Sequence, residues 1–238
     1  MNKIQKFKLK IFADGADLKD FKFFKKNNLI KGFTTNPSLM RKSGVKDYKK
    51  FSKQVLKIVK NKPVSFEIFG DDLKSIEYQS RVISSWAKNV YVKIPIVNTK
   101  NNSNVSLIGK LNKQGIKINV TAIFTKEQTR KLLKKIGKKT KLIISVFAGR
   151  IADTGVDAEK EIKKHIQLSK KFKNVEILWA SVREPYNIIQ AEKTKCHIIT
   201  VPPSILNKLK IFNKNLNIYS KETVKSFYDD AQRSGYTI

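Results

Sequence analysis

Cysteine is almost absent from this chain, since Cys196 is the only one among 238 residues. A single thiol excludes an intrachain disulfide and any metal site built from several cysteines. No apolar run approaches the length needed to cross a membrane. The first ten residues carry the positive charge of a signal peptide, but Asp14 interrupts the short apolar stretch that follows. We therefore expect a reducing, cytoplasmic location.

Acidic residues are also scarce, with 19 Asp and Glu against 50 Lys and Arg, for a formal net charge of +31. Clustered cations neutralise phosphates and can indicate nucleic-acid binding. Here the lysines recur along every predicted helix, and no RNA-binding motif of aromatic and glycine residues stands out. We predict no specific nucleic-acid partner, and we keep a basic nucleic-acid-associated barrel as the alternative that is not an enzyme.

A Gly-x-Gly-x-x-Gly turn after the first strand is missing too, which argues against a dinucleotide-binding open sheet. Short apolar strands instead alternate with amphipathic helices along the chain. Eight strands with crossover helices predict an α/β fold, a (β/α)8 TIM barrel within one domain over 1–238, with a doubly wound open sheet as the alternative. The expected strands are Leu9–Asp14, Gly32–Thr35, Val64–Ile68, Val90–Ile94, Lys117–Ala122, Leu142–Val146, Glu176–Ser181 and His197–Val201.

Helical periodicity appears between these strands, as in the segment from Tyr48 to Val59, whose apolar side chains share one face. A last helix, about 220–234, follows the eighth unit, and its apolar positions predict packing on the barrel flank or on a neighbouring subunit. The other expected helices are Leu18–Asn27, Asp72–Ala87, Val105–Gln114, Thr125–Leu133, Asp157–Phe172 and Glu184–Lys193.

Lys93 lies inside the apolar run Val90–Pro95, whereas the other lysines lie mostly on polar, helix-like segments. Burial disfavours the charged ammonium form of a lysine, and the neutral amine is the form that attacks a carbonyl to give a Schiff base. Lys93 therefore points to covalent carbonyl chemistry. The structural alternative is a lysine that ends a strand and extends its ammonium group to water.

Polar residues recur where the predicted strands end, and the carboxyl ends of the strands carry the chemistry of a barrel. Glu67 interrupts an apolar run, and a carboxylic acid near a neutral lysine supplies the proton shuttle that a Schiff-base reaction needs. Each of the other residues alone is also explained as a helix cap or a turn. The set comprises Asp14, Thr34, Thr35, Asn36, Glu67, Lys93, Asn119, Thr121, Ser145, Ser181 and Arg183.

Two arginines, Arg150 and Arg183, follow the sixth and seventh predicted strands. A guanidinium group binds phosphate through two parallel hydrogen bonds, and the later strands of such barrels are a frequent phosphate site. Together they predict a phosphorylated substrate. A surface ion pair is the alternative for each.

Five short motifs connect these strand ends: TTNPS at 34–38, VKIP at 92–95, NVT at 119–121, SVFAGR at 145–150 and ASVR at 180–183. In combination they resemble the transaldolase family, in the short form that also includes fructose-6-phosphate aldolase. The similarity runs from the first strand to the Val201-Pro202-Pro203 segment, which is nearly the whole chain.

The resemblance implies a (β/α)8 barrel of the class I aldolase type that uses no metal or organic cofactor. It implies that Lys93 forms the Schiff base, that Asp14 is the acid/base, and that Glu67 and Thr121 hold the catalytic water. Short members of the family form ring-like homo-oligomers, so the resemblance implies a homo-oligomer. The implied substrate-binding residues are Thr35, Asn36, Asn119, Ser145, Phe147 and Ser181, with Arg150 and Arg183 on the phosphate.

Glu67 and Phe147 match the transaldolase branch, because the family's aldolases carry Gln and Tyr there. The resemblance thus implies transfer of a dihydroxyacetone unit from fructose 6-phosphate or sedoheptulose 7-phosphate to an aldose phosphate, as in the pentose phosphate pathway. The alternative is a fructose-6-phosphate aldolase or another sugar-phosphate aldolase, which releases dihydroxyacetone. Gly15, and the absence of a proline within 145–147, depart from the family pattern and bear on the choice of sugar.

Overall fold

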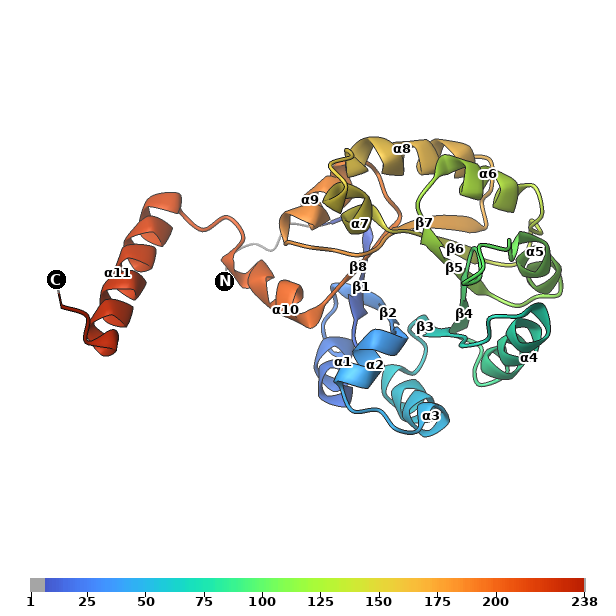
Figure 1. Ribbon diagram of the computed structural model, residues 1–238, viewed down its shortest axis with the longest axis horizontal. Helices are drawn as coiled ribbons and strands as arrows, with labels where there is room; N and C mark the ends of the chain where they lie inside the picture. Colours follow the sequence, from blue (N-terminus) through green and yellow to red (C-terminus); the bar gives the residue numbers. More distant parts are fainter. Residues whose placement is uncertain (1–6, 238) are drawn as a thin grey trace. The chain divides into compact units, whose positions relative to one another are not determined.

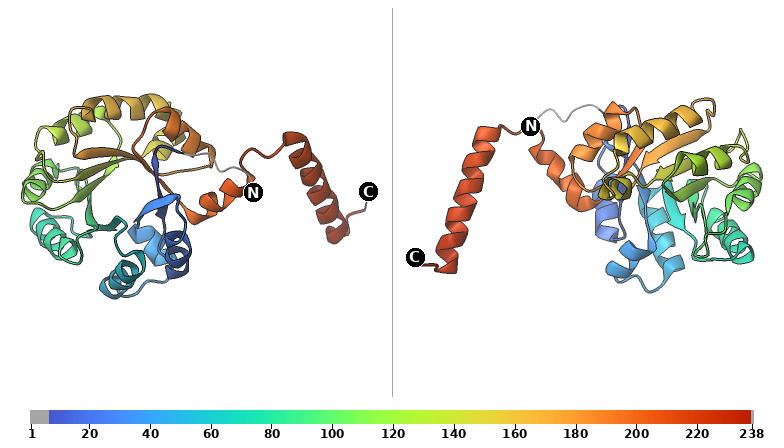
Figure 2. Two further views of the ribbon diagram at one scale, coloured as in Figure 1. Left: turned by 180° about the vertical axis from the view of Figure 1, so that it is seen from behind. Right: turned by 45° about the horizontal axis from the view of Figure 1, so that its top comes forward.

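The computed structural model describes residues 7–237, and its strands form a closed, all-parallel barrel in chain order from β1 to β8. Helices surround this ring of strands (Figure 1), as the view from behind also shows (Figure 2). The predicted (β/α)8 barrel is confirmed. The strands are β1 (Lys10–Asp14), β2 (Ile30–Thr34), β3 (Val64–Glu67), β4 (Val90–Pro95), β5 (Ile118–Ile123), β6 (Leu142–Val146), β7 (Val175–Trp179) and β8 (Ile198–Val201).

The expected helices are present, with ends that differ by a few residues from the prediction. Three short helices were not predicted: α2 (Pro37–Lys42), α7 (Ala148–Asp153) and α10 (Pro203–Leu206). Each is too short to show an amphipathic period. In the sequence, Asn36 and Pro37 are typical of a turn; in the structure, Asn36 caps α2 and Pro37 begins it. The others are α1 (Leu18–Lys25), α3 (Tyr48–Val59), α4 (Leu73–Ser84), α5 (Val105–Lys113), α6 (Lys126–Leu133), α8 (Ala158–Ser169) and α9 (Tyr186–Lys193).

Side-chain caps fix where most of the outer helices begin. Asp17, Asp47, Asp72 and Asp157 each accept a backbone N–H from the first turn of the following helix. Thr125 does the same for α6 within a capping box. Such caps satisfy N–H groups that have no partner inside the helix. For α1, α4 and α6 these caps begin the helix within a few residues of the preceding strand's carboxyl end, whereas α3 and α8 follow the short helices α2 and α7.

The barrel interior changes from apolar to polar along the strands. Phe12, Tyr91, Ile143, Leu178 and Ile198 form a buried apolar cluster. Gly32 is required opposite Phe12, because a Cβ atom there would lie 2.5 Å from the phenylalanine ring. Inward positions two residues further along most strands carry polar side chains, because successive residues of a strand face opposite sides. This polar layer lines the site.

The described chain divides into two compact units, Phe7–Leu206 and a smaller unit that contains 207–237. The smaller unit holds the 3-10 helix η1 (Asn207–Ile211) and α11 (Leu216–Ser234). The predicted extra C-terminal helix is therefore present, and it begins four residues earlier than expected because Asn215 caps it. That residues 1–238 form one domain stays a prediction. Residues 1–6, which include part of the leader-like segment, lie outside the described residues.

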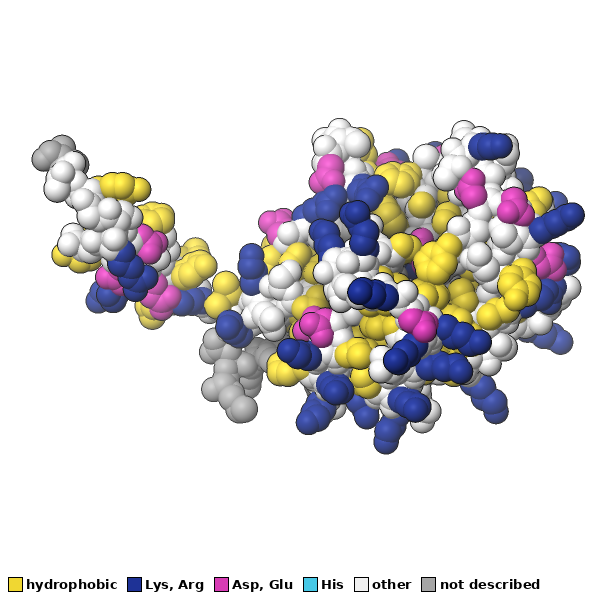
Figure 3. Space-filling view, turned by 60° about the horizontal axis from the view of Figure 1, so that its bottom comes forward, with side chains coloured by type: hydrophobic (Ala, Val, Ile, Leu, Met, Phe, Trp, Pro, Cys, Tyr) yellow, Lys and Arg dark blue, Asp and Glu magenta, His cyan; other side chains and the backbone are white. Residues whose placement is uncertain are grey.

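Basic side chains are spread over the face shown in Figure 3, and carboxylates are few among them. This agrees with the predicted even distribution of lysine. Among the described helices, none combines the length and the apolar character that a membrane crossing requires.

Candidate active site

A cavity of about 440 Å³ lies at the carboxyl ends of the strands. It brings together ten of the twelve predicted site residues, from seven different strands or the loops that follow them. The ten are Asp14, Asn36, Glu67, Lys93, Thr121, Ser145, Phe147, Arg150, Ser181 and Arg183. Thr35 and Asn119 do not line it.

Lys93 is buried at the cavity wall, with only 7% of its surface exposed. Its neighbours in β4 alternate between the barrel interior and the helix layer, so Lys93 points inward with Tyr91 and away from Val92. Its Nζ lies 3.2 Å from Glu67 Oε2 and donates a hydrogen bond of 3.2 Å to the Thr35 carbonyl. The register pairs Glu67 directly with Lys93 across β3 and β4. The pairing therefore follows from the sheet itself.

Asp14 stands at the end of β1, and a chain of hydroxyl groups supports it. Thr34 Oγ1 donates to Asp14 Oδ1 at 2.7 Å and contacts the Thr200 hydroxyl. Because the Thr34 hydrogen is used on Asp14, Thr200 must be the donor to Thr34. Burial raises the pKa of the Asp14 carboxyl, and the Glu67 charge adds to this, whereas Lys93 and the Thr34 hydrogen bond oppose it.

Thr35 and Asn119 lie behind the cavity surface, and both are fully buried. The Thr35 hydroxyl donates to the Ser65 carbonyl at 3.0 Å. Asn119 Nδ2 donates to Ser65 Oγ at 3.0 Å, and Asn119 Oδ1 accepts from Ser145 Oγ at 2.6 Å. These two residues hold the wall of the cavity in place, with Ser145 as the side chain that reaches it.

Thr121 is the one buried hydroxyl on the cavity wall that makes no hydrogen bond to the described residues. A buried polar group without a partner costs free energy unless a bound molecule satisfies it. Its neighbour Ala122 has a positive φ of 56°. Non-glycine residues in that region are strained and often occur where a site is built. Thr121 is thus available to a water molecule or a substrate.

The two arginines differ in their surroundings. Arg150 stacks above the Phe147 ring, 5.6 Å from the ring centre, and has no ion pair within 7–237. Arg183 is paired through Nε with Asp153 Oδ1 at 3.2 Å, and a second nitrogen contacts Oδ2. The predicted alternative of an ion pair therefore holds for Arg183, although it also lines the cavity.

Close backbone contact joins the two segments that carry these arginines. A Cβ atom on Gly149 would lie 1.6 Å from the Ser181 carbonyl oxygen. Ser181 itself has a positive φ of 65°. Only glycine lets α7 approach the end of β7 this closely, and the approach places Arg150 and Arg183 on the same cavity.

Other polar side chains that line the cavity were outside the predicted site: Ser38, Lys42 and Thr200, together with Thr34, which belonged to the polar strand ends. Thr200 is a polar residue within the apolar run of β8. Glu67 was predicted as a site residue from the same pattern, a polar residue that interrupts an apolar run. Lys42 ends α2, a helix too short to be predicted, so its direction was not visible in the sequence. Lys42 adds a basic side chain to the cavity besides Lys93, Arg150 and Arg183. It follows β2, which lies opposite β6 in the ring.

Among residues 7–237, no group of three or more His, Cys, Asp or Glu side chains is arranged to hold a metal ion.

The closed barrel with a polar cavity at its carboxyl ends places the chain among (β/α)8 barrel proteins. Solved structures agree: KGPDC from Streptococcus mutans matches with a TM-score of 0.55 and 11% identity, over 84% of this chain and 90% of that one. 3-Hexulose-6-phosphate synthase from Salmonella typhimurium matches with a TM-score of 0.56 and 14% identity, over 84% and 91%. At such identities these structures support the fold alone.

Sequence comparison then gives the family. The model described as Transaldolase/Fructose-6-phosphate aldolase matches residues 11–238. A "Probable transaldolase" of Dehalococcoides mccartyi is 33% identical over 202 residues, 84% of this chain and 90% of that protein. One of Methanococcus maripaludis is 36% identical over 202 residues, 84% and 89%. The chain therefore belongs to the transaldolase/fructose-6-phosphate aldolase family, and the resemblance found in its motifs is confirmed.

Proposed function

We propose that this protein is a transaldolase that moves a dihydroxyacetone unit between sugar phosphates through a Schiff base on Lys93. The single observation that carries the proposal is a buried lysine on the wall of a cavity, in contact with Glu67 and near Asp14. A class I aldolase needs a nucleophilic amine and two groups that exchange protons. Few other roles account for this combination inside a barrel.

Schiff-base formation begins at the Lys93–Glu67 pair. Glu67 accepts a proton from Lys93 across the 3.2 Å contact, and the free amine attacks the ketone carbon of fructose 6-phosphate. The carbinolamine then loses water, with Glu67 donating the proton to the leaving hydroxyl. Thr121, whose hydroxyl makes no hydrogen bond to the described residues, positions the water that carries this proton.

Asp14 acts as the base in carbon–carbon cleavage. Its carboxylate takes the proton of the C4 hydroxyl as the C3–C4 bond breaks, and the bond electrons move into the Lys93 iminium to give an enamine. The raised pKa of Asp14 makes it a stronger base than an exposed aspartate. Glyceraldehyde 3-phosphate leaves. The enamine then adds to an acceptor such as erythrose 4-phosphate, and Asp14 returns the proton.

Transfer instead of simple cleavage is favoured by Phe147. It lines the cavity and packs near Arg150 and Phe124, and it has no hydroxyl group to protonate the enamine. An aldolase that releases dihydroxyacetone is the second candidate. It is favoured only by the family match, which covers both activities.

The phosphate group is assigned to the Arg150 and Arg183 side of the cavity. Arg150 is free of carboxylate partners within the described residues, and Asp153 fixes the direction of Arg183. The substrate phosphate therefore meets one guanidinium that stacks on Phe147 without a carboxylate partner and one that Asp153 already orients.

Borohydride trapping with fructose 6-phosphate, followed by intact-mass analysis and peptide mapping, tests the proposal. We expect a three-carbon adduct on Lys93. No adduct on a folded sample would reject fructose 6-phosphate as the donor, and an adduct on another lysine would reject the assignment of Lys93.

We further propose a cytoplasmic homo-oligomer that serves sugar-phosphate metabolism of the pentose phosphate type. The family match and the absence of a membrane-spanning helix among the described residues support the location. Exposed apolar residues on α11, which include Val224 and Phe227, support association. Sedimentation analysis tests the oligomer.

A further inference from the structure

A second cavity, of about 420 Å³, lies at the opposite end of the barrel. The amino ends of β6, β7, β8 and β1, which are neighbours in the ring, form its wall together with the last turn of α8. Its volume is close to that of the first cavity. Its polar and charged lining residues are Lys10, Lys141, Lys170, Lys173, Glu176, His197, Asn174 and Ser169.

The cavity gathers positive charge that the protein itself does not neutralise. Four lysines face a single carboxylate, Glu176, which is bonded to Lys10 at 2.7 Å. Within residues 7–237, Lys141, Lys170 and Lys173 have no ion pair. Like charges held around one cavity repel one another. A bound anion would remove that repulsion.

Helix capping accounts for only part of this arrangement. Lys170 follows the end of α8, where a cation is favoured by the helix dipole. Lys10 and Lys141 stand instead at the starts of β1 and β6. Strand starts provide no comparable field, so the helix dipole does not account for the lysines at these positions.

His197 supplies a directed donor beside the lysines. Its Nδ1 accepts the Ile177 backbone N–H at 3.0 Å, so a neutral ring carries its hydrogen on Nε2. No hydrogen bond from Nε2 to another described residue is present, and the ring lines the cavity. Asn174 is fixed nearby through bonds to the Gly137 and Thr140 carbonyls. The wall is therefore ordered, while the lysines remain free to adapt.

We propose that this cavity binds a small phosphate-bearing anion with two or more negative charges, such as pyrophosphate or a nucleoside diphosphate. Lysine ammonium groups bind phosphate as point charges, and Phe172 offers an apolar surface for an attached organic group. A pocket of this volume lies within the usual range for small ligands. The inference is independent of the proposed function, because the two cavities share no residue.

Calorimetric titration with pyrophosphate and with ADP tests the site. The measurement uses the full chain carrying Arg150→Ala and Arg183→Ala, so that the first cavity contributes little. In that background we expect saturable binding with one site per chain at ~0.15 M salt. Adding Lys141→Glu and Lys173→Glu should weaken binding by roughly tenfold or more.

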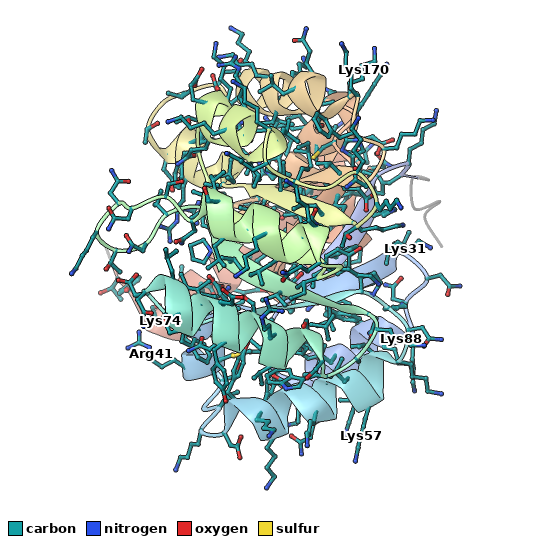
Figure 4. All side chains as sticks on the ribbon, turned by 90° about the vertical axis from the view of Figure 1, so that its right-hand side faces the viewer. Lys31, Arg41, Lys57, Lys74, Lys88 and Lys170 are labelled. Carbon is teal, nitrogen blue, oxygen red and sulfur yellow. The ribbon has the colours of Figure 1, made fainter. Side chains whose placement is uncertain are left out.

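The matched control is Lys31→Glu with Lys88→Glu. Both lysines lie at the same end of the barrel as Lys170 (Figure 4) and are exposed, but neither lines the cavity. This pair changes the net charge by the same amount and should leave the affinity unchanged. An equal loss in both pairs would mean general charge attraction, and binding of long nucleic acid without binding of pyrophosphate or ADP would equally overturn the site.

Discussion

At the scale of single residues, the Lys93–Glu67 pair holds two charged groups beside the cavity with little exposure to water. Removing two charges from water costs several kcal/mol for each ion, and their attraction does not always repay it. Apolar residues of similar size would pack at both positions without that cost. An ion pair buried beside a cavity is better explained by chemistry than by stability, and it makes substitutions at these positions informative.

Replacement of the proposed nucleophile gives the first prediction. Lys93→Met should lower turnover by at least ~10³-fold, because the proposed Schiff base needs the amine of Lys93. Met has a similar length and lacks the charge, so the fold should remain, as shown by an unchanged circular dichroism spectrum. Lys57→Met, at an exposed position of α3, is the matched control and should keep full activity. Comparable activity in both variants would end the assignment of Lys93.

The proposed assignment to the transaldolase branch rests on Glu67 and Phe147, which gives the second prediction. Glu67→Gln combined with Phe147→Tyr should raise the release of free dihydroxyacetone relative to transfer, because the added hydroxyl can protonate the enamine. The ratio is measured by incubation with fructose 6-phosphate in the presence and absence of erythrose 4-phosphate. Phe124→Tyr places a hydroxyl on the adjacent ring and serves as control. A ratio that does not change would remove these positions as the cause of transfer.

At the scale of elements, the contact between α7 and the end of β7 sets the geometry of both arginines. Gly149→Ala would push a methyl group into the Ser181 carbonyl. We expect a stability loss of ~1–3 kcal/mol from overpacking, and a loss in kcat/KM of roughly 10–100-fold from misplacement of the phosphate-binding groups. The first is measured by urea unfolding and the second by steady-state kinetics.

Gly137→Ala is the control for this prediction. The nearest atom to a Cβ atom at Gly137 is Lys113 Cγ at 3.4 Å, an ordinary contact. This variant should therefore behave like the unmodified protein. If Gly149→Ala lost stability and kept its KM for phosphorylated substrates, the contact would serve the fold alone.

The order of the strands predicts which segments meet at the site, but it does not predict which side chains reach the cavity surface. Strand alternation predicted the barrel and most of the polar cavity residues, because parallel strands bring all their carboxyl ends to one side, whereas Phe147 was implied by the resemblance to the family. It could not separate Asn119 and Thr35, which lie one layer behind, from Ser145 and Asn36, which reach the surface. That distinction depends on side-chain hydrogen bonds between neighbouring strands. Lys42 was missed for the same kind of reason, since its position depends on a short helix with no period to detect.

The packing of α6 on α8 contains a pH-sensitive group. His165 is fully buried, and its Nδ1 bonds to Thr129 Oγ1 at 2.7 Å. Burial lowers the pKa of His165 from 6.5 to about 4. The unfolded chain therefore takes up a proton first as the pH falls. The stability linked to this group is complete above pH ~6.5 and is lost as the pH falls towards ~4.

The fourth prediction follows from that linkage. Between pH 7 and pH 4 the unmodified protein should lose up to ~3 kcal/mol more unfolding free energy than a variant without the titrating ring. The comparison uses His165→Phe with Thr129→Val, which removes both hydrogen-bonding partners together. Urea unfolding at several pH values gives the difference. Parallel curves for the two proteins would show that His165 is not the group responsible.

At the scale of the whole molecule, charge dominates. With a net charge of +31 the protein attracts polyanions of every kind, and on the face shown in Figure 3 the basic side chains are spread out. Such attraction is a property of the surface field and requires no site. Because of this general attraction, a positive binding assay alone does not show a specific site. The second cavity, at the amino ends of the strands, therefore needs the charge-matched control.

Salt dependence separates this general attraction from a specific nucleic-acid function. We expect a labelled single-stranded RNA to bind at ~50 mM salt and to lose roughly a thousandfold in affinity by ~200 mM, because released counterions drive the binding. Fluorescence anisotropy at both salt concentrations measures it, with RNAs of unrelated sequence as controls. Lys93→Met should bind identically, since the removed charge is buried and paired. Affinity that persists at the higher salt and differs between sequences would instead support a barrel that acts on nucleic acid.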